Sequence, residues 1–292
     1  MIVSASRRTD LPAFYSDWFM NRVRAGFCEV PNPVRPDQVA RVSLAPEDVE
    51  ALVFWTRNPR PLMRHLDELD RRGLRFLFLF TLLGHPRALD PHGPSADSAV
   101  ETFRRLADRL GPARVVWRYD PLVLSQATDP DWHRRQFAHL AGRLRGFTRR
   151  CKLSLVDRYA KMAPRMRALE GTPHAFDEGP APAGLLEDLA GLARENGILL
   201  ESCAETEDLA SRGIPAGRCI DPDLLFEVFG IEVPRRKDPG QRPSCGCAVS
   251  RDIGMYDTCR FGCAYCYAVR DFAAARRHHA RHDPQGPRLR TP

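Results

Sequence analysis

Six short apolar segments alternate with helical patterns along most of the chain, and this alternation restricts the possible folds more than any other feature. Several segments, such as FLFLF from Phe76, are apolar at every position, as strands covered on both faces must be. The repeated order requires right-handed crossovers and predicts an α/β fold with a parallel sheet. The predicted strands are Ile2–Ser6, Ala51–Thr56, Arg75–Thr81, Ala113–Tyr119, Lys152–Val156 and Gly197–Ser202.

Apolar residues recur at helical spacing between these strands. Two stretches, 171–184 and 231–244, have no periodic pattern and predict irregular structure. Residues 280–292 combine Pro, Gly and Arg without an apolar period, which predicts a disordered basic tail after a single domain over 1–279. The predicted helices cover 100–110, 137–144 and 185–192, with weaker candidates at 12–25 and 61–72.

The C-terminal ends of the predicted strands are polar. In SASRRTD, FWTRNP, FTLLGHP, WRYDP, SLVDRYAK and ESCAE the sequence changes from apolar to charged at that end. Active sites of α/β barrels are built from these ends. A Rossmann fold is less well supported, because no GxGxxG follows a strand. We expect a partial or permuted (β/α) barrel with parallel strands and a cysteine-rich C-terminal segment.

The net charge of +7 raises the question of nucleic-acid binding. Only three of the 44 basic residues are lysine, so the charge reflects an arginine bias, and nucleic acid as a partner is unsupported. The longest apolar run, 76–83, is far shorter than the roughly 18 residues that cross a bilayer. The start MIVSASRRTD has its charges after the apolar stretch, unlike a signal peptide. These features predict a cytoplasmic protein without a membrane partner.

Most of the nine cysteines lie in the last third of the chain. Disulfides are disfavoured in a reducing compartment, so clustered thiols there indicate metal or redox chemistry. The strongest motif is CRFGCAYCY, in which Cys259, Cys263 and Cys266 have the spacing C-x3-C-x2-C. Three thiolates can bind three irons of a 4Fe–4S cluster and leave the fourth iron open, as a catalytic site requires. A structural zinc site and three inert thiols on one helix face are the alternatives.

Four further cysteines form a candidate second site. Cys203 ends the sixth predicted strand, and Cys219 precedes a helix expected to start near Pro222. Cys245 and Cys247 lie in a CGC turn just before the first motif. Four thiolates could hold zinc or a second 4Fe–4S cluster. With equal weight, Cys203 and Cys219 are small buried side chains and the CGC pair is a redox couple.

Charged residues recur at the predicted strand ends. Like charges at one mouth are unfavourable unless acids or a ligand neutralise them, and arginine pairs with carboxylate or phosphate through two parallel hydrogen bonds. We therefore expect a small anionic substrate or a nucleotide, with an ion-pair network at the rim as the alternative for any one residue. The candidate catalytic residues are Arg7, Asp10, Arg57, Arg118, Asp120 and Asp157, with Arg8, Arg158 and Lys161 nearby. The candidate cofactor-binding acids are Glu201 and Glu205.

Together these motifs resemble a known family. Over most of residues 1–268 the chain is similar to the uncharacterised bacterial family known as domain of unknown function 1848. The family's C-terminal cysteines are similar to the cluster motif of the radical S-adenosylmethionine superfamily. The resemblance rests on SASRRTDLPAFYS from Ser4, FWTRNP from Phe54, RYDP from Arg118, ESCAE from Glu201, RCID from Arg218 and DIGMYDTCRFGCAYCYA from Asp252.

The resemblance implies a 4Fe–4S cluster and S-adenosylmethionine as cofactors. In that superfamily the cofactor's amino and carboxylate groups chelate the open iron. An electron from the reduced cluster breaks the C–S bond and gives a 5′-deoxyadenosyl radical, which takes a hydrogen atom from the substrate. The resemblance also implies a place for Tyr265 near the adenine, and a reducing electron donor such as flavodoxin or ferredoxin.

Two features differ from the superfamily pattern. Its cysteine loop normally follows the first strand, whereas this loop comes last, so we expect a permuted barrel that restores the spatial arrangement. The superfamily's Gly-Gly-Glu stretch has no counterpart, because the chain contains no Gly-Gly. Two other functions remain open: an iron–sulfur protein for electron transfer or nucleic-acid repair, and a zinc-stabilised barrel hydrolase or binding protein.

Overall fold

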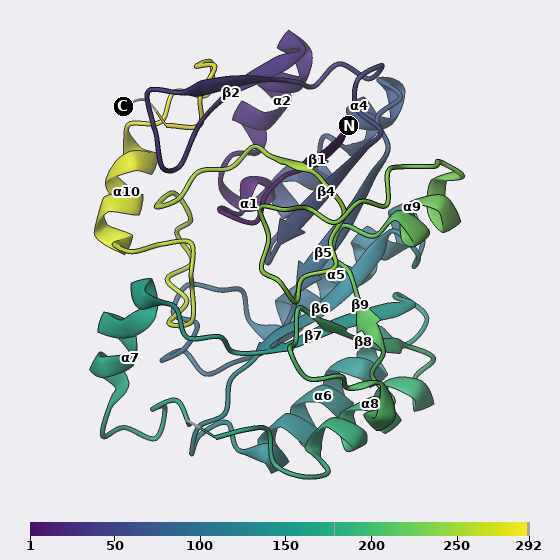
Figure 1. Ribbon diagram of the computed structural model, residues 1–292, viewed down its shortest axis with the longest axis vertical. Coiled ribbons are helices and arrows are strands. Elements are labelled where there is room, and N and C mark those ends of the chain that lie inside the picture. Colours follow the sequence, from purple (N-terminus) through teal and green to yellow (C-terminus); the bar gives the residue numbers. More distant parts are fainter. Residues whose placement is uncertain (178, 291–292) are drawn as a thin grey trace.

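The structure is a computed structural model that describes residues 1–177 and 179–290, and a parallel sheet forms its centre (Figure 1). Within these residues the sheet has eight strands in the order β10-β1-β4-β5-β6-β7-β8-β9. A separate antiparallel hairpin pairs β2 with β3. The sheet strands are β10 (Arg251–Asp252), β1 (Ile2–Ser4), β4 (Ala51–Thr56), β5 (Phe76–Thr81), β6 (Val115–Leu122), β7 (Arg150–Leu155), β8 (Leu199–Cys203) and β9 (Ala216–Gly217), and the hairpin strands are β2 (Phe27–Pro31) and β3 (Val39–Ser43).

The predicted strands are confirmed as β1 and β4 to β8, within a few residues at each end. Four strands were not predicted. The hairpin strand β3 has exposed residues at most positions and carries no apolar run, and β9 and β10 contain two residues each. Such short edge strands exist because a neighbouring strand pairs with them, and their own residues carry little pattern.

The predicted helices are also present, and their ends follow the expected signals. Ser95 caps α5 by accepting a hydrogen bond from the Ser98 N–H group, and Gly111 follows the last turn. The weaker candidates are each split into two short helices. The helices are α1 (Leu11–Phe14), α2 (Ser16–Ala25), α3 (Arg60–Met63), α4 (Leu66–Arg71), α5 (Ala96–Leu110), α6 (Pro130–Leu144), α7 (Ala163–Leu169), α8 (Leu185–Glu195), α9 (Pro222–Phe229) and α10 (Phe272–Ala280), with 3₁₀ turns at Ala160–Met162 and Ala210–Arg212.

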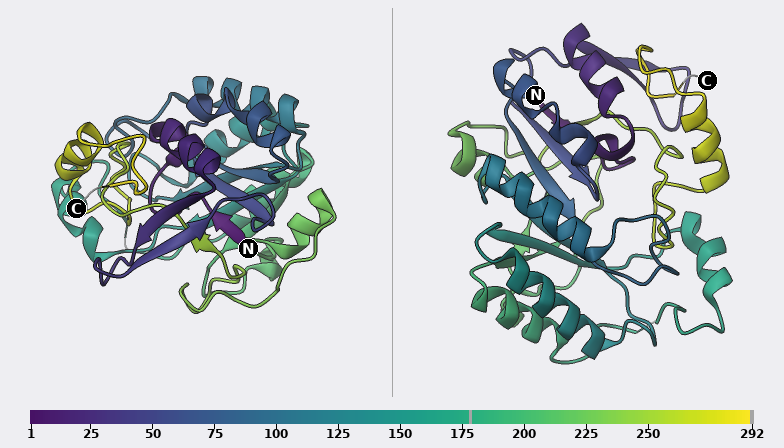
Figure 2. Two further views of the ribbon diagram at one scale, coloured as in Figure 1. Left: turned by 90° about the horizontal axis from the view of Figure 1, so that it is seen from above. Right: turned by 180° about the vertical axis from the view of Figure 1, so that it is seen from behind.

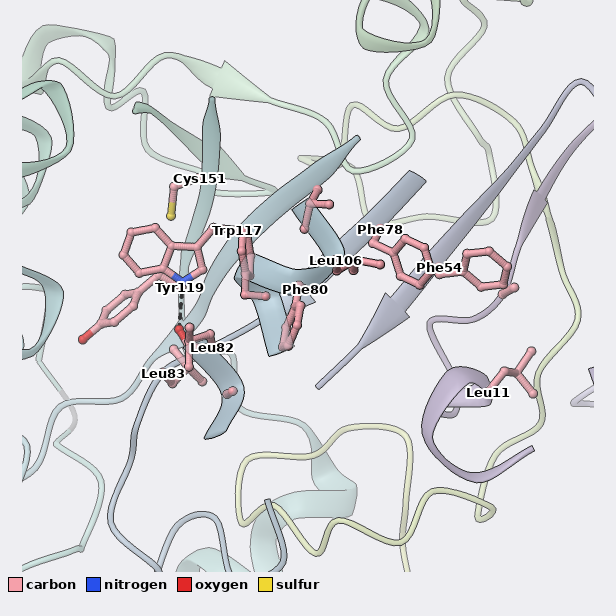
Figure 3. Packing of buried hydrophobic residues seen from close by; sticks show 14 of the residues in the cluster. Leu11, Phe54, Phe78, Phe80, Leu82, Leu83, Leu106, Trp117, Tyr119 and Cys151 are labelled. Atoms are coloured by element: carbon pink, nitrogen blue, oxygen red, sulfur yellow. Dashed lines mark hydrogen bonds between the residues drawn. The ribbon is translucent and has the colours of Figure 1, made fainter. Parts of the chain in front are cut away.

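The two faces of the sheet are covered differently. On one face α2, α4, α5, α6 and α8 lie side by side, as the view from behind shows (Figure 2). There Phe54 stacks on Phe78 with ring centroids 4.9 Å apart, and the indole N–H of Trp117 donates to the Leu82 carbonyl (Figure 3). On the other face Val53, Leu77 and neighbours contact the segment that carries α9. Burial on both faces explains the continuous apolar strands.

The sheet is curled and open, which confirms the partial α/β barrel (Figure 2). Its two edges are β9 and β10. Although β10 comes last in the chain, it pairs in parallel with β1, with Val3 opposite Arg251. The remaining strands follow in chain order, so the sheet reads as a barrel whose first strand has been moved to the C-terminus. The cysteine segment thereby follows the first strand in space.

The C-terminal segment lies against α2. The Trp18 indole donates to the carbonyl of Gly286 at 3.0 Å, Arg22 donates to Gln285, and Leu289 is 2% exposed. The sequence predicts disorder from residue 280, whereas the structure gives residues 284–289 defined contacts, several of them hydrogen bonds from Trp18, Asn21 and Arg22 of α2. The part of that prediction that concerns 291–292 lies outside the described residues. Among the described residues, the helices lack the combination of length and apolar character that a membrane crossing requires.

Candidate metal and ligand site

A cavity of about 430 Å³ lies at the C-terminal ends of the strands. Arg7 follows β1, Arg57 follows β4, and Arg118 lies on β6, and all three line it. Both cysteine groups predicted from the sequence also lie on its wall. The topology therefore brings together residues that are more than 200 positions apart in the chain.

Asp252 attaches the cysteine segment to the end of β1. One carboxylate oxygen accepts from the Ser4 hydroxyl at 2.7 Å and the Arg7 N–H at 2.8 Å, and the other accepts from the Ser6 hydroxyl at 2.7 Å. The backbone also comes close, because a Cβ at Gly254 would lie 2.0 Å from the Ser6 Oγ. These contacts fix where the loop starts relative to the sheet.

The cysteine loop itself is held by backbone groups. The Arg165 guanidinium donates to the carbonyls of Ala264, at 3.1 Å, Val269, at 2.9 Å, and Cys266. The Ala264 N–H donates to the Leu89 carbonyl at 2.9 Å. Many polar contacts of the loop thus involve its main chain. The three cysteines line the cavity.

Of the three cysteines of this loop, Cys263 is buried and Cys259 and Cys266 are half-buried. Burial raises the pKa of Cys259 to about 12, although the backbone N–H groups of Phe261 and Asp10 act in the opposite direction. Burial also raises the pKa of Cys263 and Cys266. Thiols in such surroundings become thiolates when a metal supplies positive charge. The N–H groups directed at sulfur are of the kind that stabilises iron–sulfur ligands.

Arg57 joins this loop to the sheet. Its guanidinium forms a buried ion pair with Asp90, donates to the Tyr265 hydroxyl, and lies 3.5 Å from the Cys263 sulfur. Burial lowers the pKa of Arg57, but the charges of Asp90, Tyr265 and Cys263 outweigh it, so the pKa is raised well above its ordinary value. The Arg57 N–H donates to Asp10 at 2.7 Å, and burial raises the pKa of Asp10 to about 7.

Arg7 and Arg118 lie on the cavity wall near the second cysteine group. Arg118 pairs with Asp120, which also accepts from the Ser154 hydroxyl at 2.7 Å. Arg7 packs over the Trp55 ring, with its guanidinium carbon 4.9 Å from the centroid. Within the described residues, Arg7 Nη2 and Arg118 Nε are buried and make no hydrogen bond. Cations with unused donors on a cavity wall are suited to an anionic ligand.

The second cysteine group is closely packed. The sulfurs of Cys203 and Cys219 are 3.4 Å apart, and all four side chains are at least nine-tenths buried. Hydrogen bonds from Cys219 and Cys245 lower the pKa of the Cys247 thiol, and burial opposes them. The Ile220 N–H donates to the Cys247 sulfur at 3.3 Å. The predicted grouping of these four residues is present in the structure.

Some candidate residues lie outside the cavity wall. Glu201 is buried against Lys152, with 2.9 Å between carboxylate and ammonium, and Glu205 accepts from the Leu155 N–H. Arg158 donates to the Phe176 carbonyl, and Lys161 packs over Tyr256. None of these four candidate residues is among those that line the cavity. Asp157 does line the cavity, and it pairs with Arg242.

Sequence reasoning missed Asp90, Asp252 and Arg165. Asp252 stands just upstream of the cysteines, but its partners lie more than 240 residues away. Asp90 and Arg165 lie in segments without a recognisable motif. A tertiary contact to a motif leaves no local signal, which is why pattern analysis cannot find such residues.

Across residues 1–177 and 179–290, no three His, Cys, Asp or Glu side chains are already arranged around one point as ligands of a single metal ion. In a 4Fe–4S cubane each cysteine binds a different iron, so the sulfurs of such a site do not surround one ion. For the second group, the thiols hydrogen-bond to one another. Two donor sets of cysteine sulfur therefore face the cavity, and neither is preformed around one ion.

The chain was compared with known proteins. A family model described as "Domain of unknown function (DUF1848)" matches residues 2–268. The matched region extends from β1 through the cysteine loop, and so contains the cavity wall described above. No curated protein matches the chain.

Proposed function

We propose that this chain, which belongs to the family described as domain of unknown function 1848, is a radical S-adenosylmethionine enzyme with a small anionic substrate. One observation carries the proposal. The C-x3-C-x2-C loop lies on the wall of a cavity at the C-terminal ends of a parallel half-barrel, beside Arg57 and Arg118.

The loop fits a 4Fe–4S cluster bound by Cys259, Cys263 and Cys266. Cys263 is buried, and Cys259 and Cys266 are half-buried. Backbone N–H groups approach Cys259 and Cys266, and Arg57 approaches Cys263. When bound, the cluster would supply an electron to S-adenosylmethionine and so a 5′-deoxyadenosyl radical for hydrogen abstraction. The residues around it hold the loop in place and limit access of water.

The place of the loop in the sheet supports the same function. In the superfamily the cysteine loop follows the first barrel strand. Here β10 precedes the loop and lies at the sheet edge beside β1, so the loop occupies the corresponding position despite its place in the chain. The permutation would place this C-terminal motif where the superfamily has its N-terminal cysteine loop.

The cavity is large enough for a small-molecule ligand. Its volume of about 430 Å³ falls within the roughly 300–1,000 Å³ of ordinary ligand sites. Asp120 lies on its wall and can accept hydrogen bonds from a cofactor's amino or hydroxyl groups. The Tyr265 hydroxyl is bound to Arg57 and Asp90, so Tyr265 acts mainly by positioning Arg57.

The arginines favour an anion over a neutral substrate. Arg7 and Arg118 each carry a buried N–H group without a partner among the described residues. Carboxylate or phosphate would satisfy these donors, whereas a lipid or neutral sugar would leave the charge of Arg7 less compensated. The proposed substrate is therefore phosphorylated or carboxylated.

We place the protein in the cytoplasm with a low-potential electron donor of the flavodoxin or ferredoxin kind. All nine cysteines belong to the described residues and are free thiols. Free thiols in this number are typical of a reducing compartment, which the cluster also needs.

Electron paramagnetic resonance tests the proposal. The anaerobically reconstituted, dithionite-reduced protein should show a 4Fe–4S signal that shifts when S-adenosylmethionine is added, because the cofactor changes the ligands of one iron. A Cys259→Ala, Cys263→Ala, Cys266→Ala variant should lose this signal. The matched control changes Cys28 and Cys151 to Ala, which are buried away from the cavity, and should keep it. A signal that does not respond to S-adenosylmethionine would contradict the proposal.

A further inference from the structure

The second cysteine group lies where the two edges of the open sheet meet. Cys203 ends β8, and Cys219 follows the edge strand β9 by two residues. Cys245 and Cys247 shortly precede β10, which is the opposite edge of the same sheet. The four thiols therefore join segments that the sheet itself does not connect by hydrogen bonds.

Other contacts hold the same segments together. The Ala248 N–H donates to the Ile220 carbonyl at 3.1 Å, and the Ser244 hydroxyl donates to the Ala204 carbonyl at 2.8 Å. The Ile220 N–H points back at the Cys247 sulfur at 3.3 Å. The backbone thus places the thiols near one another and supplies an N–H···S hydrogen bond, as around metal-bound thiolates.

The spacing of two of the sulfurs is compatible with a shared metal ion, although the four thiols are not arranged around one point among the described residues and would have to turn toward the ion on binding. Sulfurs bound to a tetrahedral zinc at about 2.3 Å lie about 3.8 Å from one another. The Cys203 and Cys219 sulfurs are 3.4 Å apart, close to that separation. A cubane would keep its cysteine sulfurs farther apart, because each binds a separate iron. A disulfide would bring two sulfurs to about 2.05 Å and would leave the other two thiols unused.

The charges nearby also suit such a site. Four thiolates and one divalent ion carry two negative charges. Arg7 lies close enough to Cys247 and Cys219, and Arg118 to Cys219 and Cys203, for the sulfurs to act on their charge. Both residues also line the cavity. The surroundings thus place positive charge beside a dianionic metal centre, while Arg7 Nη2 and Arg118 Nε have no hydrogen-bond partner among the described residues.

We propose that Cys203, Cys219, Cys245 and Cys247 bind a single divalent metal ion, zinc in the first instance, in a closed four-thiolate site that links the two edges of the half-barrel. The site is structural, because four protein ligands leave no open position. Its four cysteines line the same cavity as the C-x3-C-x2-C loop. The proposal does not depend on a cluster at that loop.

Metal analysis of the anaerobically purified protein tests the site. We expect about one zinc per chain. That zinc should remain in the Cys259→Ala, Cys263→Ala, Cys266→Ala variant and fall to a trace in a Cys245→Ser, Cys247→Ser variant. The control variant Cys28→Ser, Cys151→Ser loses two buried thiols elsewhere and should keep its zinc. The zinc content does not depend on the iron–sulfur signal that the first variant loses. The zinc site and the proposed function can therefore be disproved independently of each other.

X-ray absorption at the zinc edge is measured on the wild-type protein, so its result does not depend on whether a variant folds. The spectrum should show four sulfur neighbours of zinc at about 2.3 Å. Zinc with nitrogen or oxygen ligands, zinc retained in the Cys245→Ser, Cys247→Ser variant, a second iron–sulfur cluster in place of zinc, or a Cys203–Cys219 disulfide by mass spectrometry would each overturn the proposal.

Discussion

At the residue scale, the site depends on a few buried charges that hold the cysteine loop. Arg57 was predicted to lie at the cavity because it follows a strand, and it does. Its partner Asp90 was not predicted, since it lies 33 residues away in a segment without a motif. Residue types at strand ends can therefore be predicted from the pattern, whereas the pairs they form depend on tertiary packing.

Arg57→Ala should strongly destabilise the protein, because it leaves Asp90 buried without a counter-charge. The exposed side-chain fractions of the pair are 14% and 6%, and breaking such a pair costs about 3–5 kcal/mol. The free energy of unfolding in urea measures the loss. Arg24→Ala, which breaks a more exposed pair with Glu68, should cost at most about 1 kcal/mol. Equal losses in the two variants would show that the buried pair has no special role.

Arg7 and Arg118 should bind an anion in the cavity. With inorganic phosphate as the simplest probe, an Arg7→Gln, Arg118→Gln variant should bind at least about tenfold more weakly, because each charge-assisted hydrogen bond contributes roughly 1.5–3 kcal/mol. Calorimetry measures the affinity. Arg158→Gln, outside the cavity wall, should leave it unchanged. Equal weakening by Arg158→Gln would exclude a specific role for the other two.

At the scale of the elements, the cysteine segment approaches the end of β1 closely at Gly254, where a side chain has no room. A side chain at Gly254 would overlap Ser6, so Gly254→Ala should cost about 1–3 kcal/mol in unfolding free energy and reduce cluster loading. Gly191 in α8 has open space around it, so Gly191→Ala should be neutral or stabilise by up to about 1 kcal/mol. Full stability and loading in Gly254→Ala would mean that the segment is held elsewhere.

A buried histidine connects α6 to β6. His133 hydrogen-bonds the Tyr119 hydroxyl at 2.8 Å and the Val123 carbonyl at 3.0 Å, and burial lowers its pKa to about 4. The pKa of His133 in the folded protein lies below the unfolded value of 6.5. The contribution of neutral His133 to the free energy of unfolding is therefore full above pH 6.5 and is lost as the pH falls from 6.5 through 4.

Wild-type protein should therefore lose about 3 kcal/mol more stability between pH 7 and pH 4 than a His133→Gln variant. Urea unfolding at both pH values measures the difference. His85 remains in both proteins, so its own titration largely cancels. Identical pH dependence would place the origin of acid sensitivity elsewhere.

At the scale of the whole molecule, the sequence predicts the centre of the sheet better than its edges. The run from Phe76 is apolar throughout because β5 is covered on both faces, and that pattern is local. The strands β9 and β10 exist through pairing alone, and β10 owes its position to Asp252 and the close approach of Gly254. The permuted order was expected only from the place of the cysteine loop.

We propose that a C-terminal cysteine loop, placed beside β1, makes this half-barrel a radical S-adenosylmethionine enzyme. The most direct measurement is the formation of 5′-deoxyadenosine during anaerobic incubation with dithionite and S-adenosylmethionine. The wild-type protein and the Cys28→Ala, Cys151→Ala control should form 5′-deoxyadenosine. The Cys259→Ala, Cys263→Ala, Cys266→Ala variant should form none above background. No 5′-deoxyadenosine from wild-type protein carrying a full cluster, or undiminished formation by the triple variant, would contradict it.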